Sequence, residues 1–135
     1  MKCISVCITF LLLVGISLAE EPAIKTFTAT AGPDNIQKVD ILAGDFFFDP
    51  NVIIVKVNQP VELSIKKEGR IVPHVIAMKS PEAGMEFEES ISREPKTIKF
   101  TPTKTGKFPF SCTKKPPFLK SHADRGMKGT IEVVE

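Results

Sequence analysis

Four side chains in this sequence are of types that bind soft metal ions. Cys112, His122 and Met127 follow one another in the order Cys-x9-His-x4-Met, and His74, the only other histidine, lies far upstream. A thiolate, two imidazoles and a thioether form the ligand set of a blue-copper electron-transfer site, in which three strong ligands lie roughly in a plane and a weak axial methionine tunes the potential. The sequence contains one copy of this set and almost no spare ligands. These residue types therefore point to one copper ion.

The N-terminal segment has the pattern of a secretory signal peptide. Lys2 precedes an uncharged, mostly apolar run over residues 3–19, and Ser17 and Ala19 place small residues at positions −3 and −1 before Glu20. We therefore predict a signal peptide at residues 1–19 and an exported mature chain, with the bacterial periplasm as its compartment. The run is about as short as a membrane span can be and is interrupted by Ser, Thr and Gly, so we expect no stable span after cleavage.

Cleavage after residue 19 would leave Cys112 as the only cysteine, because Cys3 and Cys7 lie in the predicted signal peptide. Exported proteins usually pair their cysteines, so an unpaired one is a free thiol, an intermolecular bridge or a metal ligand. Without an internal disulfide the mature chain must rely on a hydrophobic core, which one domain of this length can supply. The formal net charge is only +2 and falls to +1 without Lys2, which gives no support to nucleic-acid binding.

Short β-forming runs separated by turn residues make up the expected domain, residues 36–135. Residues 20–35 are rich in Thr, Ala and turn formers and are expected to form a flexible N-terminal arm. Polar and apolar residues alternate in several runs, as in half-buried strands, and no segment has a helical period. This pattern favours an all-β sandwich or barrel. The predicted strands cover residues 39–43, 52–57, 61–66, 74–78, 96–101, 107–112 and 129–134.

Two segments of the domain need separate interpretation. Residues 79–94 carry five glutamates around Pro81 and Gly84, so we expect an excursion with at most a short helix, whose charges solvate the surface. In the predicted strand 107–112, Cys112 falls on the same inward-facing positions as the phenylalanines before it. The chain then turns through residues 113–121 before the second histidine, and a loop of this kind can fold three ligands around one point.

Each candidate ligand also has an ordinary structural interpretation. A buried thiol can be a small hydrophobe, a lone histidine at a strand start is usually hydrogen-bonded, and a methionine is usually core filler, as we expect for Met78 and Met85. Zinc is the main competing metal, but structural zinc sites favour several closely spaced thiolates, which are missing here. A Cys-His pair could also be a nucleophile and its base, yet an inward-facing thiol leaves no evident substrate cleft. The joint order of the four residues favours copper.

These features together resemble the cupredoxin family of small copper proteins, which includes plastocyanin, azurin and rusticyanin. The resemblance covers residues 36–135 and rests on the Phe-x-Phe-x-Cys strand, the His-x4-Met pair, the closing Gly-Thr-Ile-Glu-Val-Val strand and the single upstream histidine. It implies an antiparallel Greek-key β-sandwich with copper ligands His74, Cys112, His122 and Met127. Nine residues separate the cysteine from the second histidine, as in the longer-loop minority of the family, and Val75 stands where Asn or Ser often follows the first histidine.

A protein of this kind would carry single electrons by cycling between Cu(I) and Cu(II), without substrate chemistry, so we expect no enzymatic activity. We expect electrons to leave through an exposed edge of His122. Asp124 is the only acid among several nearby cations, and this basic rim could steer an acidic redox partner or could simply solvate the loop. The cations are Lys114, Lys115, Lys120, Arg125 and Lys128. A copper storage or delivery protein, a metal-free interaction module and an oxidoreductase with an open copper position are the alternatives.

Overall fold

The computed structural model describes residues 22–135, so the predicted signal peptide lies outside the described residues. Within this range no helix has the length and apolar character needed to cross a membrane. The strands are β1 (Thr26–Thr28), β2 (Gln37–Gly44), β3 (Phe47–Asp49), β4 (Val52–Lys56), β5 (Val61–Lys67), β6 (His74–Ser80), β7 (Met85–Ile91), β8 (Lys96–Phe100), β9 (Gly106–Ser111) and β10 (Lys128–Val134), with a 3-10 helix, η1 (Pro81–Ala83), between β6 and β7.

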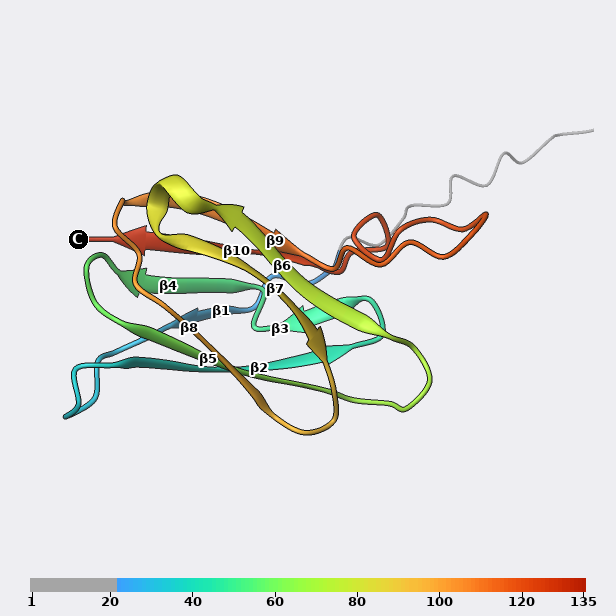
Figure 1. The fold of residues 1–135 in the computed structure, drawn as a ribbon, viewed down its shortest axis with the longest axis horizontal. Coiled ribbons are helices and arrows are strands. Elements are labelled where there is room, and N and C mark those ends of the chain that lie inside the picture. Colours follow the sequence, from blue (N-terminus) through green and yellow to red (C-terminus); the bar gives the residue numbers. More distant parts are fainter. Residues whose placement is uncertain (1–21) are drawn as a thin grey trace, which may run out of the picture.

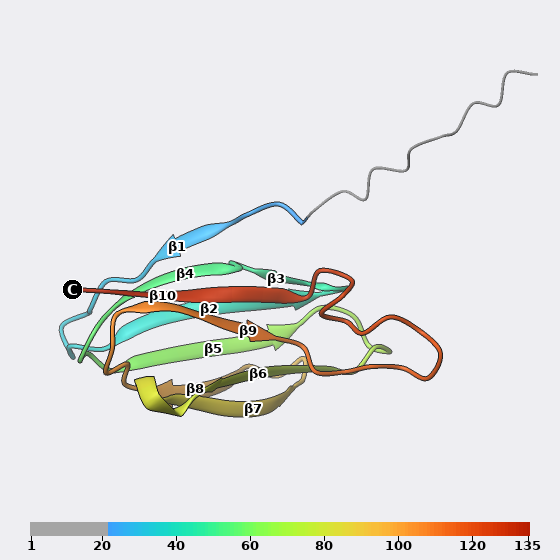
Figure 2. The ribbon, with the colours of Figure 1, turned by 90° about the horizontal axis from the view of Figure 1, so that it is seen from above.

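The strands form two sheets that pack face to face, which confirms the predicted β-sandwich (Figures 1 and 2). One sheet has the order β1-β4-β10-β9-β6-β7 and the other the order β3-β2-β5-β8. Both sheets are mixed rather than purely antiparallel, because β4 runs parallel to β1 and β10, and β2 runs parallel to β5. Parallel neighbours cannot be joined by a hairpin, so the chain crosses to the other sheet between them.

The core lies between the sheets and is filled by alternate residues of their strands. Val61, Leu63 and Ile65 of β5 are all buried, as their alternation with polar residues predicts. Phe48 from one sheet contacts Phe110 from the other edge to face, with ring centroids 5.3 Å apart. Because Phe110 belongs to β9, this contact also fixes the end of the strand that leads to the metal-binding candidates.

Strand β7 was not predicted from the sequence. Within the glutamate-rich segment 79–94, η1 is the expected short helix, but Met85–Ile91 pairs with β6 as an antiparallel edge strand. Met85 and Ile91 are buried, whereas the glutamates between them are exposed or half-buried. Outward charges are typical of an edge strand, where they discourage pairing with another chain, and here they obscured the inward apolar positions. Met78 and Met85 are core residues, as predicted.

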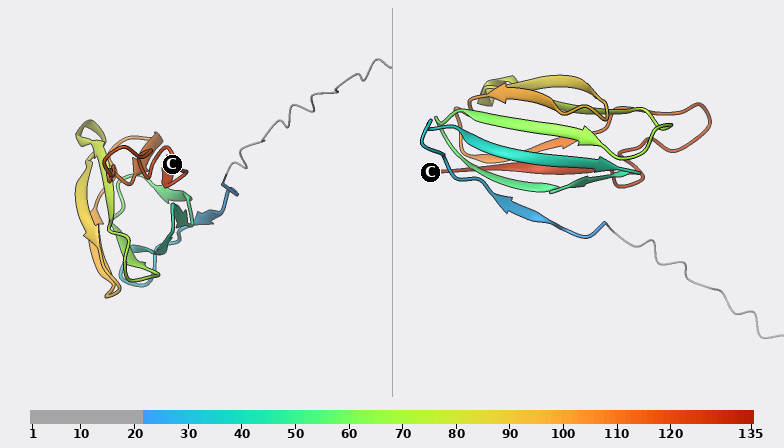
Figure 3. Two further views of the ribbon diagram at one scale, coloured as in Figure 1. Left: turned by 90° about the vertical axis from the view of Figure 1, so that its right-hand side faces the viewer. Right: turned by 90° about the horizontal axis from the view of Figure 1, so that it is seen from below.

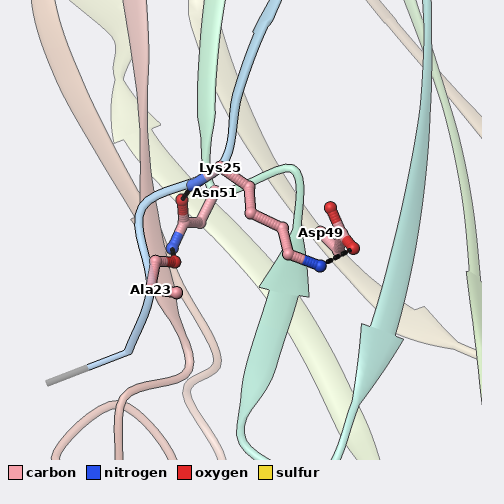
Figure 4. Close-up of polar contacts among 4 residues, drawn as sticks. All are labelled: Ala23, Lys25, Asp49 and Asn51. Atoms are coloured by element: carbon pink, nitrogen blue, oxygen red, sulfur yellow. Dashed lines mark hydrogen bonds and ion pairs between the residues drawn. The ribbon is translucent and has the colours of Figure 1, made fainter. Parts of the chain in front are cut away.

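The arm predicted at residues 20–35 is not flexible throughout, because Thr26–Thr28 add strand β1 to the edge of a sheet. Thr and Phe favour extended backbone. Asn51 secures the start of this segment: its side chain accepts a hydrogen bond from the Lys25 N–H (2.8 Å) and donates one to the Ala23 carbonyl (3.0 Å), as Figure 4 shows. The Lys25 ammonium also pairs with Asp49. The sandwich therefore begins before residue 36.

Gln37 connects the two sheets through its buried side chain. It begins β2, and its amide donates hydrogen bonds to the carbonyls of Lys56 and Gln59 and accepts one from the Lys56 N–H. Lys56 ends β4 in the opposite sheet. A fully paired buried amide of this kind stabilises the contact between β2 and β4. Without it, the backbone groups of Lys56 and Gln59 that it pairs with would lose these hydrogen bonds.

We predict that Gln37→Met lowers the free energy of unfolding by about 1–3 kcal/mol, because it keeps the volume but removes every one of these hydrogen bonds. Urea denaturation of the metal-free protein should show a lower midpoint with an unchanged m value. The matched control is Lys38→Met on the exposed neighbour, which should change stability by less than about 0.5 kcal/mol. Equal losses in the two variants would contradict the role assigned to Gln37.

Candidate metal centre

The candidate ligands gather at one end of the sandwich, opposite to the end that carries the C-terminus (Figure 1). His74 is the first residue of β6, Cys112 directly follows β9, Met127 directly precedes β10, and His122 lies in the loop that joins β9 to β10. The antiparallel register of β9 and β10 therefore brings the cysteine opposite the methionine. The strand framework thus determines the positions of three of these residues and leaves His122 to the loop.

Three of the four predicted ligands converge on one point. The ligand atoms of His74, Cys112 and His122 all lie within 4.8 Å of one another. The Cys112 Sγ lies 3.5 Å from Nδ1 of His122. All three side chains are at most 2% exposed. One thiolate and two imidazoles at this spacing could hold a metal ion, and soft copper suits this donor set.

Backbone hydrogen bonds close the base of the long β9–β10 loop. The Cys112 N–H donates to the Met127 carbonyl (3.0 Å), and the Met127 N–H donates to the His122 carbonyl (3.0 Å). The His122 N–H donates to the carbonyl of Lys114 (2.9 Å), only two residues after the cysteine. The residues between Lys114 and His122 project away from the sandwich (Figures 1 and 2). The long spacing therefore does not separate the ligands.

Met127 is fully buried beside the other candidates. Its backbone hydrogen bonds with Cys112 and His122 place it next to the three converging residues, and its axial role stays a prediction. Gly129 permits the close approach of the following strand, since a Cβ there would lie 2.3 Å from the Phe110 ring and 2.5 Å from the Asn51 carbonyl oxygen. A larger residue would push β10 away from the site.

The protonation states of the histidines suit metal binding. Burial chiefly, and the charge of His122 next, lowers the pKa of His74; burial, followed by the charges of Arg125 and Lys114, lowers the pKa of His122. Both imidazoles are therefore neutral at neutral pH, the form in which they bind metals. Nδ1 of His74 is also buried and has no hydrogen-bond partner among residues 22–135. Coordination would satisfy this nitrogen, which is otherwise unfavourably buried.

The sulfur of Cys112 accepts a hydrogen bond from the backbone N–H of Val75 (3.4 Å). Such a donor stabilises the thiolate and influences the potential of a copper ion bound to it. The donor is a main-chain group, so it does not require a polar side chain at this position. The departure from the family pattern at Val75 therefore leaves this contact intact.

Phe46 covers both histidines and was missed by the sequence analysis. Its ring meets that of His122 edge to face with centroids 5.0 Å apart, and its centroid lies 6.4 Å from that of His74. It occupies the turn between β2 and β3 with a left-handed φ of 66°. The Arg125 guanidinium lies 3.4 Å from the centroid of the Phe46 ring. The three consecutive phenylalanines at 46–48 were the only signal, and they do not reveal which ring faces the site.

His122 is less accessible than predicted. Its side chain is only 2% exposed, so the expected exposed edge is wrong. The aromatic cover of Phe46 contributes to this burial. The residue instead forms part of a shallow groove between the loops that precede β6 and follow β9. The other residues lining the groove are Ile71, Val72, Pro73, Lys114, Lys115 and Pro116.

We predict that the metal-free protein loses stability as the pH falls below about 6.5, the ordinary pKa of histidine. Below this pH both imidazoles of the unfolded chain take up protons, whereas those of the folded chain stay neutral to lower pH because their pKa values are lowered. The free energy of unfolding therefore declines until the pH passes below the folded pKa values. Urea denaturation at a pH of about 7.5 and of about 5.5, on either side of the histidine range, measures this loss.

The control for the pH effect is the double variant His74→Gln with His122→Gln. Its stability should depend less on pH over the same interval, because it removes both protonations. An identical pH dependence in the variant and the parent protein would show that other groups are responsible.

Comparisons with known proteins agree with this fold. A family model described as a cupredoxin-like domain matches residues 8–131. A comparison with curated proteins found no match. Similar solved structures include the metal-binding domain of the Cu(I)-exporting P-type ATPase CopA from Streptococcus pneumoniae D39 (23% identity, TM-score 0.63, covering 84% of this chain and 100% of that one). Dithionite-reduced auracyanin from Roseiflexus castenholzii is also similar (19% identity, TM-score 0.58, 79% and 99%).

A third similar structure is the periplasmic domain of cytochrome oxidase subunit II from Bradyrhizobium japonicum (18% identity, TM-score 0.56, covering 73% of this chain and 83% of that one). At these identities the likeness concerns the fold alone. The family model covers most of the chain, and both its description and the observed sandwich agree with the resemblance noted in the sequence. The chain belongs to the cupredoxin family.

Proposed function

We propose that this protein is an exported one-electron carrier that binds a single copper ion through His74, Cys112, His122 and Met127. The observation that carries the proposal is the convergence of a buried thiol with two buried imidazoles, one of which has a ring nitrogen with no other partner in the described chain. The donor set fits copper, which when bound would supply the Cu(I)/Cu(II) couple.

The role of the protein is to keep its ligands in one arrangement. The hydrogen bonds at the base of the β9–β10 loop restrict Cys112 and His122, and the ring of Phe46 limits the movement of both imidazoles. Burial keeps water from the site, and the Val75 N–H stabilises negative charge on the sulfur. A site held in this way rearranges little when its charge changes, as an electron carrier requires.

The groove over His122 is the expected docking position for an acidic redox partner. Lys114 and Lys115 line the groove, and Arg125 lies nearby over Phe46. Within residues 22–135, none of these three cations forms an ion pair. Their charges are therefore available to steer a partner of opposite charge toward the groove.

The proposed setting is outside the cytoplasm. It is supported by the predicted signal peptide at residues 1–19 and by the single cysteine that the predicted mature chain would retain. One similar structure is described as a periplasmic domain. We therefore expect the mature protein in the periplasm.

The proposal is tested by adding Cu(II) to the purified metal-free protein and recording its visible spectrum. An intense thiolate-to-copper charge-transfer band should appear and saturate at one equivalent. Cys112→Ser should abolish the band, whereas Met127→Leu should retain it but shift the midpoint potential, because the axial ligand tunes that potential. The matched control is Met85→Leu, a buried core methionine at the far end of β7, which should change neither property.

Absence of the band from protein whose circular dichroism shows an intact fold would contradict the proposal. A potential that shifts equally in Met127→Leu and Met85→Leu would contradict the axial role of Met127.

Copper delivery is the second candidate, because one similar structure is the metal-binding domain of a Cu(I)-exporting ATPase. A carrier should give reversible voltammetry and retain copper in both oxidation states. A delivery protein should instead release Cu(I) rapidly to a competing chelator. Voltammetry and chelator competition on the same loaded sample distinguish the two.

A further inference from the structure

The end of the molecule that carries the metal centre exposes large apolar side chains that the fold does not use. Beyond the hydrogen bond that closes the β9–β10 loop, a tight turn forms in which the Leu119 N–H donates to the Pro116 carbonyl (3.4 Å). Phe118, at the apex of this turn, is fully exposed, and Leu119 is 59% exposed. The loop between β5 and β6 lies at the same end (Figures 2 and 3), and its Ile71 is 92% exposed. We call Ile71, Phe118 and Leu119 the apolar tip.

Phe118 is doubly unfavourable in the isolated domain. Its φ of 60° lies in the left-handed region, at the turn position after Pro117 where glycine is usual. A bulky residue in this conformation is strained, and its exposed ring gains nothing from burial. Glycine would remove both disadvantages. The presence of phenylalanine at the apex therefore points to a contact outside the domain.

Four cations lie behind the apolar tip and form what we call the cationic collar. Lys114, Lys115 and Lys120 occupy the two sides of the loop between its apex and its closed base, and Arg70 adjoins Ile71. All four are exposed, and none forms an ion pair with another described residue. Residues 113–123 contain no acid. Two acids lie beside the collar: Glu68, two residues before Arg70, and Asp124, within reach of the charges of Lys115 and Lys120. The four cations outnumber these two acids, so this end of the molecule attracts negatively charged surfaces.

We propose that the apolar tip and the cationic collar bind the surface of an anionic lipid bilayer. Along the direction in which the β9–β10 loop projects, Phe118 and Leu119 come first, the lysines of the loop next and the polar sandwich last, whereas Ile71 lines the groove beside Lys114 and Lys115. An interfacial anchor meets the layers of a membrane in this order: acyl boundary, charged headgroups and water. The apolar groups insert below the headgroups, and the collar pairs with lipid phosphates.

The projecting loop apex favours a bilayer over an acidic protein as its occupant. Because Lys114 and Lys115 also line the groove over His122, a redox partner docked in that groove would compete with the bilayer. Protein interfaces gather their apolar anchors near the centre of a continuous patch with a polar rim. Here the β9–β10 loop, whose apex carries the exposed Phe118 and Leu119, projects beyond the sandwich (Figure 3), a shape that suits insertion into a soft surface. Neither the tip nor the collar includes a proposed copper ligand, so binding does not require copper. Such binding would also turn the metal centre toward the membrane, and this consequence alone rests on the proposed function.

The proposal is tested by sedimenting the protein, metal-free and copper-loaded, with vesicles of phosphatidylcholine and with vesicles that also contain phosphatidylglycerol. Both forms should bind the anionic vesicles more strongly and lose that preference at high salt. Phe118→Ser with Leu119→Ser should weaken partitioning at least about tenfold, because two apolar groups no longer insert. Replacing Lys114, Lys115 and Lys120 by Gln should abolish the preference for anionic lipid.

The matched control is Phe27→Ser, which removes an exposed aromatic ring from β1 and should leave binding unchanged. Because the chain contains no tryptophan, Phe118→Trp provides a single fluorophore at the apex. Its emission should shift to the blue on anionic vesicles, whereas that of Phe27→Trp should not. Circular dichroism of each variant checks that the fold is retained.

Two results would overturn the proposal. One is that the parent protein does not sediment with anionic vesicles and the emission of Phe118→Trp does not change in their presence. The other is vesicle binding that the tip and collar substitutions leave unaltered. If the parent protein does not bind lipid and the tip substitutions weaken its association with an acidic protein, the occupant is a protein and the bilayer proposal is wrong.

Discussion

The hydrogen bond from the Cys112 N–H to the Met127 carbonyl is the constraint on which the candidate metal centre depends. It extends the β9–β10 ladder by one step and holds the two ends of the ligand loop together. The bond between His122 and Lys114 then closes the loop a second time. Because of these two bonds, the positions of the candidate ligands do not depend on the number of residues in the loop. Extra residues are extruded beyond the second bond, where they can lengthen or change without moving a ligand.

Burial keeps the two histidines of the site in the neutral form that binds metals. The two histidines are neutral because charging them inside the domain is unfavourable, and Nδ1 of His74 has no hydrogen-bond partner within residues 22–135 that would compete with a metal. Phe46 covers both rings and is itself covered by Arg125. The side chains of the site are thus in place without a metal. The free-energy cost of ordering them and removing them from water is largely offset by folding of the sandwich.

The sequence predicted what depends on local pattern and missed what depends on packing between distant segments. Alternation identified β5 and the inward-facing side of β9, and the rarity of Cys and His pointed to the three residues that converge, His74, Cys112 and His122. Strand β7 was missed because its glutamates masked Met85 and Ile91, and β1 because its pairing depends on β4. The burial of His122 beneath Phe46 joins two loops far apart in sequence, so no local pattern could reveal it. The axial role of Met127 remains a prediction.

The same loop thus serves two purposes in our proposals: its base holds the copper ligands, and its apex meets a surface outside the protein. The binding of one copper ion by Cys112 and two histidines is tested most directly by X-ray absorption at the copper edge of stoichiometrically loaded protein. The extended fine structure should show one short copper–sulfur bond and two imidazole nitrogens, with the sulfur contribution lost in Cys112→Ser. A spectrum with only nitrogen and oxygen ligands, or one unaltered by that substitution, would contradict the proposed metal centre.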